Sequence, residues 1–151
     1  LGRVAILASS QPTLMVYREG LARGVEGANR LVWHVEVGKG IDVRDFVFVD
    51  DVVDIIEWLL DTSGVSGVFN AGSGQARSFL DLANATFAAA GKTPRVEYVD
   101  TPASIRDKYQ YFTEARMDRV RAAGFQGQST PLEEGVRRYV QSFLATADPY
   151  R

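Results

Sequence analysis

The stretch that decides the fold is GKGIDVRDFVFVDDVV, residues 38–53. A glycine turn leads into a β-rich run over Arg44–Val49. A helix start at Asp50 or Asp51 follows, where a carboxylate suits the positive end of the helix. Apolar residues then recur at helical spacing, which predicts one buried face made of Val52, Val53, Ile55, Ile56, Leu59 and Leu60.

Strands and helices also alternate on either side of this stretch. Short β-rich runs predict strands at 3–8, 31–37, 67–70 and 95–99, and an extended segment at 109–112. Capping residues and apolar periodicity predict helices at 12–23, 78–91, 113–123 and 131–144. The predicted fold class is therefore α/β, with a small mixed sheet and flanking helices.

Composition limits the possible functions. The 151 residues are 46% hydrophobic and 24% charged, which predicts one domain over 1–151 with its own core. The net charge of −2 does not favour a nucleic acid or a membrane surface as partner. The absence of Cys excludes disulfides, and a single His excludes a multi-His zinc site. No apolar run is long enough to span a membrane and no signal peptide is visible, so we expect a cytoplasmic protein.

Few residues stand out as candidates for chemistry. Arg44 follows a glycine turn at the start of a strand, where its guanidinium fork could bind a phosphate. The alternative is an ion pair with Asp42 or Asp45. The turn at Gly72-Ser73-Gly74 could hold a phosphate too, but a plain turn that needs positive φ explains it better.

Other polar residues give a weaker indication of a functional site. His34 lies in a strand-like run without the serine pattern of a hydrolase, so we interpret it as structural. The pair Asp50-Asp51 is interpreted as a helix start and not as a metal site, because no third oxygen ligand follows at a useful spacing.

A resemblance to a known family rests on these motifs. The pattern G-x-G-x-x-x-R-D-F-V-x-V-x-D-V-V, followed by GVFNAGSG, resembles the C-terminal half of the extended short-chain dehydrogenases/reductases. These are NAD(P)-dependent nucleotide-sugar epimerases and dehydratases. The runs KYQYFT and RAAGF, with EGV after them, are most similar to the ADP-L-glycero-D-manno-heptose 6-epimerases within that family. The resemblance covers 38–144 and leaves 1–37 poorly matched.

The resemblance implies which residues bind substrate. By position, Arg44 and Tyr109 would contact the nucleotide-sugar, and Gly38 matches the glycine of the substrate loop. The bidentate fork of an Arg fits this role on a diphosphate. The phenol of Tyr109 offers a hydroxyl and a ring face, although an aromatic residue of the core or its rim would look the same in sequence.

The departures from the family pattern bear on catalysis. None of the six Tyr residues has a Lys four positions later, so the Tyr-x-x-x-Lys pair of the family is absent. Gly20, Gly24 and Gly27 do not have the spacing of a dinucleotide-binding loop. We therefore expect no catalytic and no cofactor-binding residues in this chain, although the resemblance implies NADP for the full-length family.

These features together predict the substrate-binding part of a larger epimerase, inactive alone. The start at Leu1 and not at Met, and a length of about half such an enzyme, agree with a cut chain. Two alternatives remain open. One is a non-enzymatic interaction module that self-associates through the surface left by the missing half. The other is a fragment of an epimerase or dehydratase for another nucleotide-sugar.

Overall fold

Strands and helices are interspersed in the part of the chain that the computed structural model describes, which is residues 4–8, 33–37, 42–100 and 109–145. The strands are β1 (Val4–Ala8), β2 (Trp33–Val37), β3 (Val43–Asp45), β4 (Gly67–Ala71), β5 (Ala76–Ser78) and β6 (Val96–Asp100). The helices are α2 (Val49–Asp61), α3 (Phe79–Ala89), α5 (Asp118–Ala122), α6 (Leu132–Tyr139) and the π-helical η1 (Val140–Leu144). This order confirms the α/β class, while the predicted helix at 12–23 lies outside the described residues.

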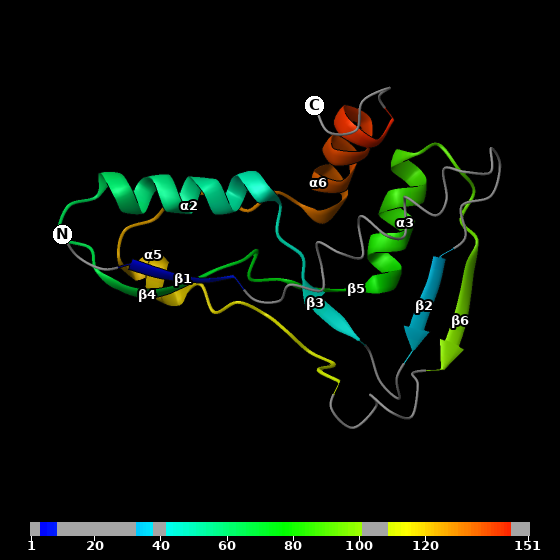
Figure 1. The fold of residues 1–151 in the computed structure, drawn as a ribbon, viewed down its shortest axis with the longest axis horizontal. Helices are drawn as coiled ribbons and strands as arrows, with labels where there is room; N and C mark the ends of the chain where they lie inside the picture. The colour runs from blue at the N-terminus through cyan, green and yellow to red at the C-terminus, as the bar shows by residue number, and fades with distance from the viewer. Residues whose placement is uncertain (1–3, 9–32, 38–41, 101–108, 146–151) are drawn as a thin grey trace.

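The strands pair two by two. β1 pairs with β4 and β2 with β6, both in parallel, whereas β3 and β5 are antiparallel. Val43 of β3 also forms a parallel bridge with Phe112. Figure 1 shows β3 and β5 between two groups of elements, one made of α2, β1, β4 and α5 and the other of α3, α6, β2 and β6. β3 therefore occupies the junction between the two groups.

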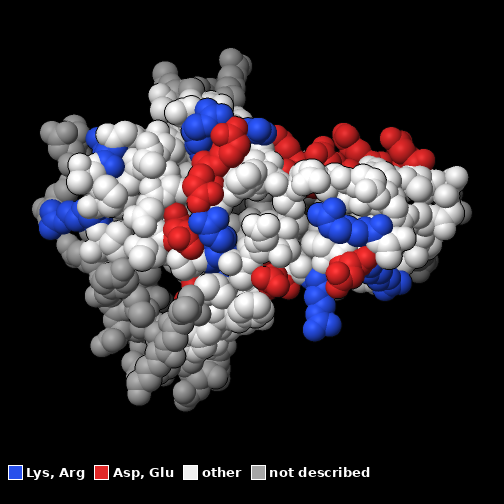
Figure 2. Space-filling view, turned by 180° about the vertical axis from the view of Figure 1, so that it is seen from behind, with Lys and Arg blue, Asp and Glu red and all other residues white. Residues whose placement is uncertain are grey.

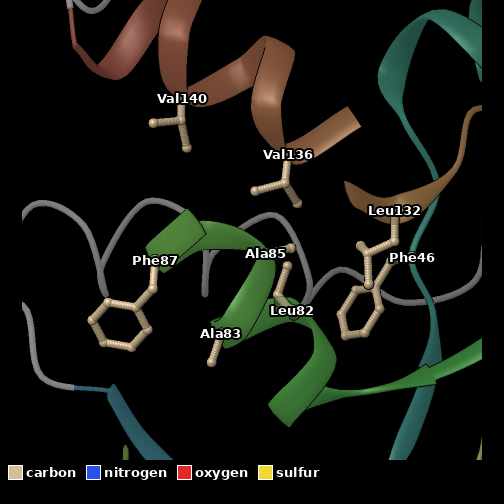
Figure 3. Close-up of a cluster of buried hydrophobic side chains, with 8 residues drawn as sticks. All are labelled: Phe46, Leu82, Ala83, Ala85, Phe87, Leu132, Val136 and Val140. Atoms are coloured by element: carbon tan, nitrogen blue, oxygen red, sulfur yellow. The ribbon is translucent and has the colours of Figure 1, made fainter. Parts of the chain in front are cut away.

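Each group has its own hydrophobic core. Figure 3 shows the core between α3 and the C-terminal helices, in which Val136 of α6 and Val140 of η1 reach toward α3 and Leu132 lies beside Phe46. The second lies under α2 and consists of Ile55, Leu59, Phe69, Ala71, Ala115, Met117, Val120 and Phe125. No helix in the described ranges combines the length and the apolar character that crossing a bilayer requires.

Helix α3 begins as its sequence predicts. Ser78 accepts a hydrogen bond from the Asp81 amide, and the Asp81 carboxylate accepts one from the Ser78 amide, which is a complete capping box. Its buried residues do not all lie on one face of the helix, because Ala85 and Phe87 are buried along with Leu82. α3 therefore packs against neighbours on more than one side.

Helix α2 departs from its prediction at its start and along its face. Phe48 and not an Asp is the N-cap residue, and it makes no side-chain cap. The Asp51 carboxylate instead accepts hydrogen bonds from the amide and the hydroxyl of Thr130. Of the predicted buried face only Ile55 and Leu59 are fully buried, because the core lies on one side of the helix and the apolar residues extend beyond that side.

The segment 113–117 forms no helix, where the sequence predicted the first turns of one. The Thr113 amide donates to the Val43 carbonyl, and the Ala115 amide donates to the Asp45 carboxylate. These amides are therefore bonded to β3, and the helix begins only at Asp118. β3 itself ends at Asp45 and not at Val49, because β5 offers only three residues to pair with it.

The packing of the buried core and of the exposed side of α2 can be compared with the same substitution at two sites. Val136→Ala removes two methyl groups from the α3–α6 core, so we expect the free energy of unfolding to fall by about 1.5–3 kcal/mol. Val53→Ala on the exposed part of α2 should change it by less than about 0.5 kcal/mol. Urea unfolding followed by circular dichroism measures both, and equal losses would contradict the packing described.

Candidate functional site

The guanidinium of Arg44 lies at the junction of the two groups. Its Nη1 lies 2.7 Å from Oδ1 of Asp42, and both side chains are almost fully buried. Nη1 also donates to the Val43 carbonyl at 2.9 Å, and Nη2 donates to the carbonyl of Gln110. The ion pair with Asp42, one of the alternatives that the sequence left open, is thus the one observed.

Two aromatic rings flank the same guanidinium. Its central carbon lies 5.2 Å from the ring centre of Tyr109 and 5.8 Å from that of Phe79, both within cation–π range. The Tyr109 ring packs edge-on against Tyr111 at 5.1 Å. The structure therefore brings Arg44 and Tyr109 together, two of the three predicted substrate-binding residues. The third, Gly38, lies outside the described residues.

The Asp42 carboxylate is the counter-ion of this site. Burial raises its pKa above the ordinary value of 3.8, while a hydrogen bond from Tyr109 and the charge of Arg44 oppose that shift. Any anion that binds the Arg44 fork must compete with a carboxylate already in contact with it. Asp42 therefore controls how readily the guanidinium becomes available.

A second buried carboxylate, that of Asp45, fixes the backbone around the site. Its Oδ1 accepts hydrogen bonds from the amide and the hydroxyl of Ser73 at 2.7 and 2.6 Å. Its Oδ2 accepts from the amides of Gly74 and Ala115 at 2.9 and 2.8 Å. β3, the loop after β4 and the segment 113–117 are thus joined through one side chain.

The same bonds explain the turn at Gly72-Ser73-Gly74. Gly74 has φ +72°, as the interpretation of a plain turn expects. The amides of Ser73 and Gly74 donate to a protein carboxylate, which occupies the place where a phosphate would have to lie in a cradle. A Cβ on Gly72 would lie 2.4 Å from the Ala115 Cβ, so the close approach of the two segments requires a glycine there.

Other candidate sites have partners of their own. A pocket of about 100 Å³ beside the turn is lined by Phe46, Ser73, Gln75, Arg77, Ser129, Thr130, Pro131 and Leu132, and neither Arg44 nor Tyr109 lines it. Arg77 in this pocket pairs with Glu133 at 2.6 Å and with Asp81 at 3.3 Å. Within the described ranges, no three His, Cys, Asp or Glu side chains come together as metal ligands.

The alternation of side chains along an extended segment indicates how the residues of this site are oriented. Residues two apart in an extended chain share a face, and neighbours point to opposite faces. That rule pairs Arg44 with Asp42 and turns Asp45 the other way, as observed. The contacts of Arg44 with Phe79 and with the Gln110 carbonyl come from distant segments and left no local trace in the sequence.

Comparisons with known proteins agree with these motifs. Residues 14–72 match the model of the NAD dependent epimerase/dehydratase family. An ADP-L-glycero-D-manno-heptose-6-epimerase of Nitratidesulfovibrio vulgaris strain DP4 is 47% identical over 129 residues, 84% of this chain. The corresponding enzyme of Fusobacterium nucleatum is 44% identical over 117 residues, 74% of this chain. The chain spans 40% and 35% of the lengths of these two relatives.

Solved structures show the same fold at lower identity. The UDP-glucose 4-epimerase of Thermus thermophilus, solved with NAD, superimposes with a TM-score of 0.71 at 21% identity, over 97% of this chain and 48% of its own. The ADP-L-glycero-D-manno-heptose-6-epimerase of Helicobacter pylori gives 0.69 at 21% identity, over 96% and 45%. The chain therefore has the fold of part of a Rossmann-type epimerase.

Gly72→Ala tests the close approach at the Asp45 carboxylate. The new Cβ would clash with Ala115 and would lie 2.7 Å from Asp45 Oδ2, so we expect the free energy of unfolding to fall by about 1–3 kcal/mol. The double variant Gly72→Ala/Ala115→Gly removes one of the two clashes and should recover part of the loss. The exposed Ser66→Ala serves as control in urea unfolding. If the effects of the two substitutions on the free energy of unfolding simply add in the double variant, the contact between Gly72 and Ala115 is contradicted.

The environment of Asp42 can be tested by carboxyl NMR titration. We expect a pKa above 3.8 and a further rise in Tyr109→Phe, which removes a hydrogen bond that stabilises the charged form. Tyr111→Phe should leave the pKa unchanged. The pKa of Asp42 is higher in the folded than in the unfolded chain, so its ionisation destabilises the fold. We therefore expect the free energy of unfolding to fall as the pH rises from 3.8 through the folded pKa, and Asp42 to make no difference below 3.8, where the carboxyl is protonated in both states. A pKa at or below 3.8 would contradict the burial described.

Proposed function

Because this chain carries a domain of the NAD dependent epimerase/dehydratase family, we propose that it is the nucleotide-sugar-binding part of such an enzyme, with an ADP-heptose as its ligand. The observation that supports this is the convergence of Arg44 and Tyr109. Residues 65 positions apart in the chain meet with the guanidinium carbon 5.2 Å from the ring centre. The identity of 47% to an ADP-heptose epimerase favours that sugar over others.

The chemistry of the site suits a diphosphate. The Arg44 fork can form two parallel hydrogen bonds to phosphate oxygens, which an ammonium cannot do. To receive the ligand, the guanidinium exchanges its contact with Asp42 for one with the phosphate. The ring of Tyr109 then limits where Arg44 can move. These residues bind and orient, and they transfer no proton in this proposal.

We also propose that the 151 residues do not catalyse epimerisation by themselves. The family model that residues 14–72 match is named for NAD dependence, and that cofactor supplies the hydride chemistry when bound. In the described part of the chain, the glycine turn that follows a strand has its Ser73 and Gly74 amides bonded to Asp45, so it does not fit a dinucleotide pyrophosphate. The sequence also holds no Tyr-x-x-x-Lys pair to move a proton.

Isothermal titration calorimetry with ADP-heptose tests the binding proposal. Arg44→Gln removes a charge-assisted pair worth about 1.5–3 kcal/mol, so we expect the dissociation constant to rise by about 10- to 100-fold. Arg44→Lys keeps the charge without the fork and should fall between wild type and Arg44→Gln. Tyr109→Phe should weaken binding less. Arg116→Gln, an exposed charge loss elsewhere, is the matched control, and circular dichroism verifies the fold of each variant.

The outcomes separate the competing functions. Tighter binding of a UDP- or dTDP-sugar than of ADP-heptose would show that the ligand of this chain is another nucleotide-sugar. Equal binding by wild type and Arg44→Gln would reject the site itself. NADP binding by the isolated chain, or conversion of ADP-heptose by it, would reject the proposal that the chain is catalytically incomplete.

A further inference from the structure

Helix α2 carries an apolar stripe that no described element of the chain covers. Four of its large apolar side chains are between about one third and four fifths exposed, namely Val49 (58%), Val53 (41%), Ile56 (36%) and Leu60 (80%). Their spacing of four, three and four residues places them in one line along the helix. Single exposed apolar residues are common on protein surfaces, but a continuous row along three turns marks an interface.

An acidic row runs beside this stripe. It consists of Asp50, Asp54, Glu57 and Asp61, each one position after a member of the stripe. The 13 residues of α2 include no Lys or Arg. In Figure 2, seen from behind, Asp and Glu atoms follow the upper edge of the part of the molecule where α2 lies. The exposed side of α2 thus combines an apolar line with a flank of one sign of charge.

We propose that this side of α2 docks an amphipathic helix whose apolar seam is flanked by Lys or Arg. A four–three–four line of Val, Ile and Leu is the seam with which two helices pack side by side. Basic side chains on the partner would complete the acidic row and determine its orientation. This inference concerns a surface away from Arg44 and Tyr109, and it does not depend on the nucleotide-sugar proposal.

A second copy of the chain fits this surface less well. When two α2 helices pack antiparallel about a two-fold axis, their acidic rows lie on the same side of the seam and repel each other. The charge pattern therefore favours a partner with the opposite charge over self-association, which the sequence analysis had allowed.

Two synthetic helical peptides with the same Leu/Ile seam test the proposal. One carries Lys along the flank and the other Glu at the same positions. Because the acidic row attracts one flank and repels the other, we expect the Lys peptide to bind about tenfold or more tightly than the Glu peptide. Fluorescence anisotropy of labelled peptide against the 151-residue chain measures both, and added salt should reduce the difference.

Variants locate the binding surface. Leu60→Glu places a charge in the apolar line and should reduce the affinity for the Lys peptide by about tenfold or more. Phe143→Glu alters a side chain that is 37% exposed on η1, away from α2, and should leave binding unchanged. Both positions are exposed, so circular dichroism should show the folded chain in each case.

Three results would overturn the proposal. The first is equal binding of both peptides, or of neither. The second is a Lys-peptide affinity that Leu60→Glu does not change. The third is a dimer of the chain in sedimentation that Leu60→Glu dissociates, because the stripe would then pack against a second copy.

Discussion

The buried carboxylate of Asp45 is the constraint on which the rest of the structure depends. A charged group removed from water destabilises a fold by several kcal/mol unless its oxygens are hydrogen-bonded. Here four donors bind it, and three of them are backbone amides from segments far along the chain. The fold cannot bury Asp45 without bringing the loop after β4 and the segment 113–117 to β3. Arg44 is the preceding residue, so its position follows from the same bonds.

The sequence predicts the elements that local chemistry decides. The capping box at Ser78 and the β-rich runs of β1, β2, β4 and β6 are found close to where the pattern puts them. The prediction fails where a group that suits a local helix instead bonds to a residue far along the chain. Asp51 has the chemistry of an N-cap but binds Thr130, and the amide of Ala115 would suit a helix but donates to Asp45. No local window holds both members of these pairs.

The candidate site shows the same limit. The motif around Arg44 identifies it as a candidate, and its ion pair with Asp42 follows from strand alternation. The Gln110 carbonyl and the Phe79 ring, which complete the surroundings of the guanidinium, come from other elements that only the tertiary fold assembles. The sequence therefore indicates which side chain carries the charge, and the fold determines how freely that charge can be used.

The pairing of the strands has a kinetic consequence. Each described pair joins segments that are distant in the chain, since β1 pairs with β4, β2 with β6 and β3 with β5. Loops must close before such contacts contribute, and folding slows as the mean sequence separation of contacts grows. Helices such as α3 can form early from local bonds. Assembly of this chain is then limited by the search that brings the strand partners together.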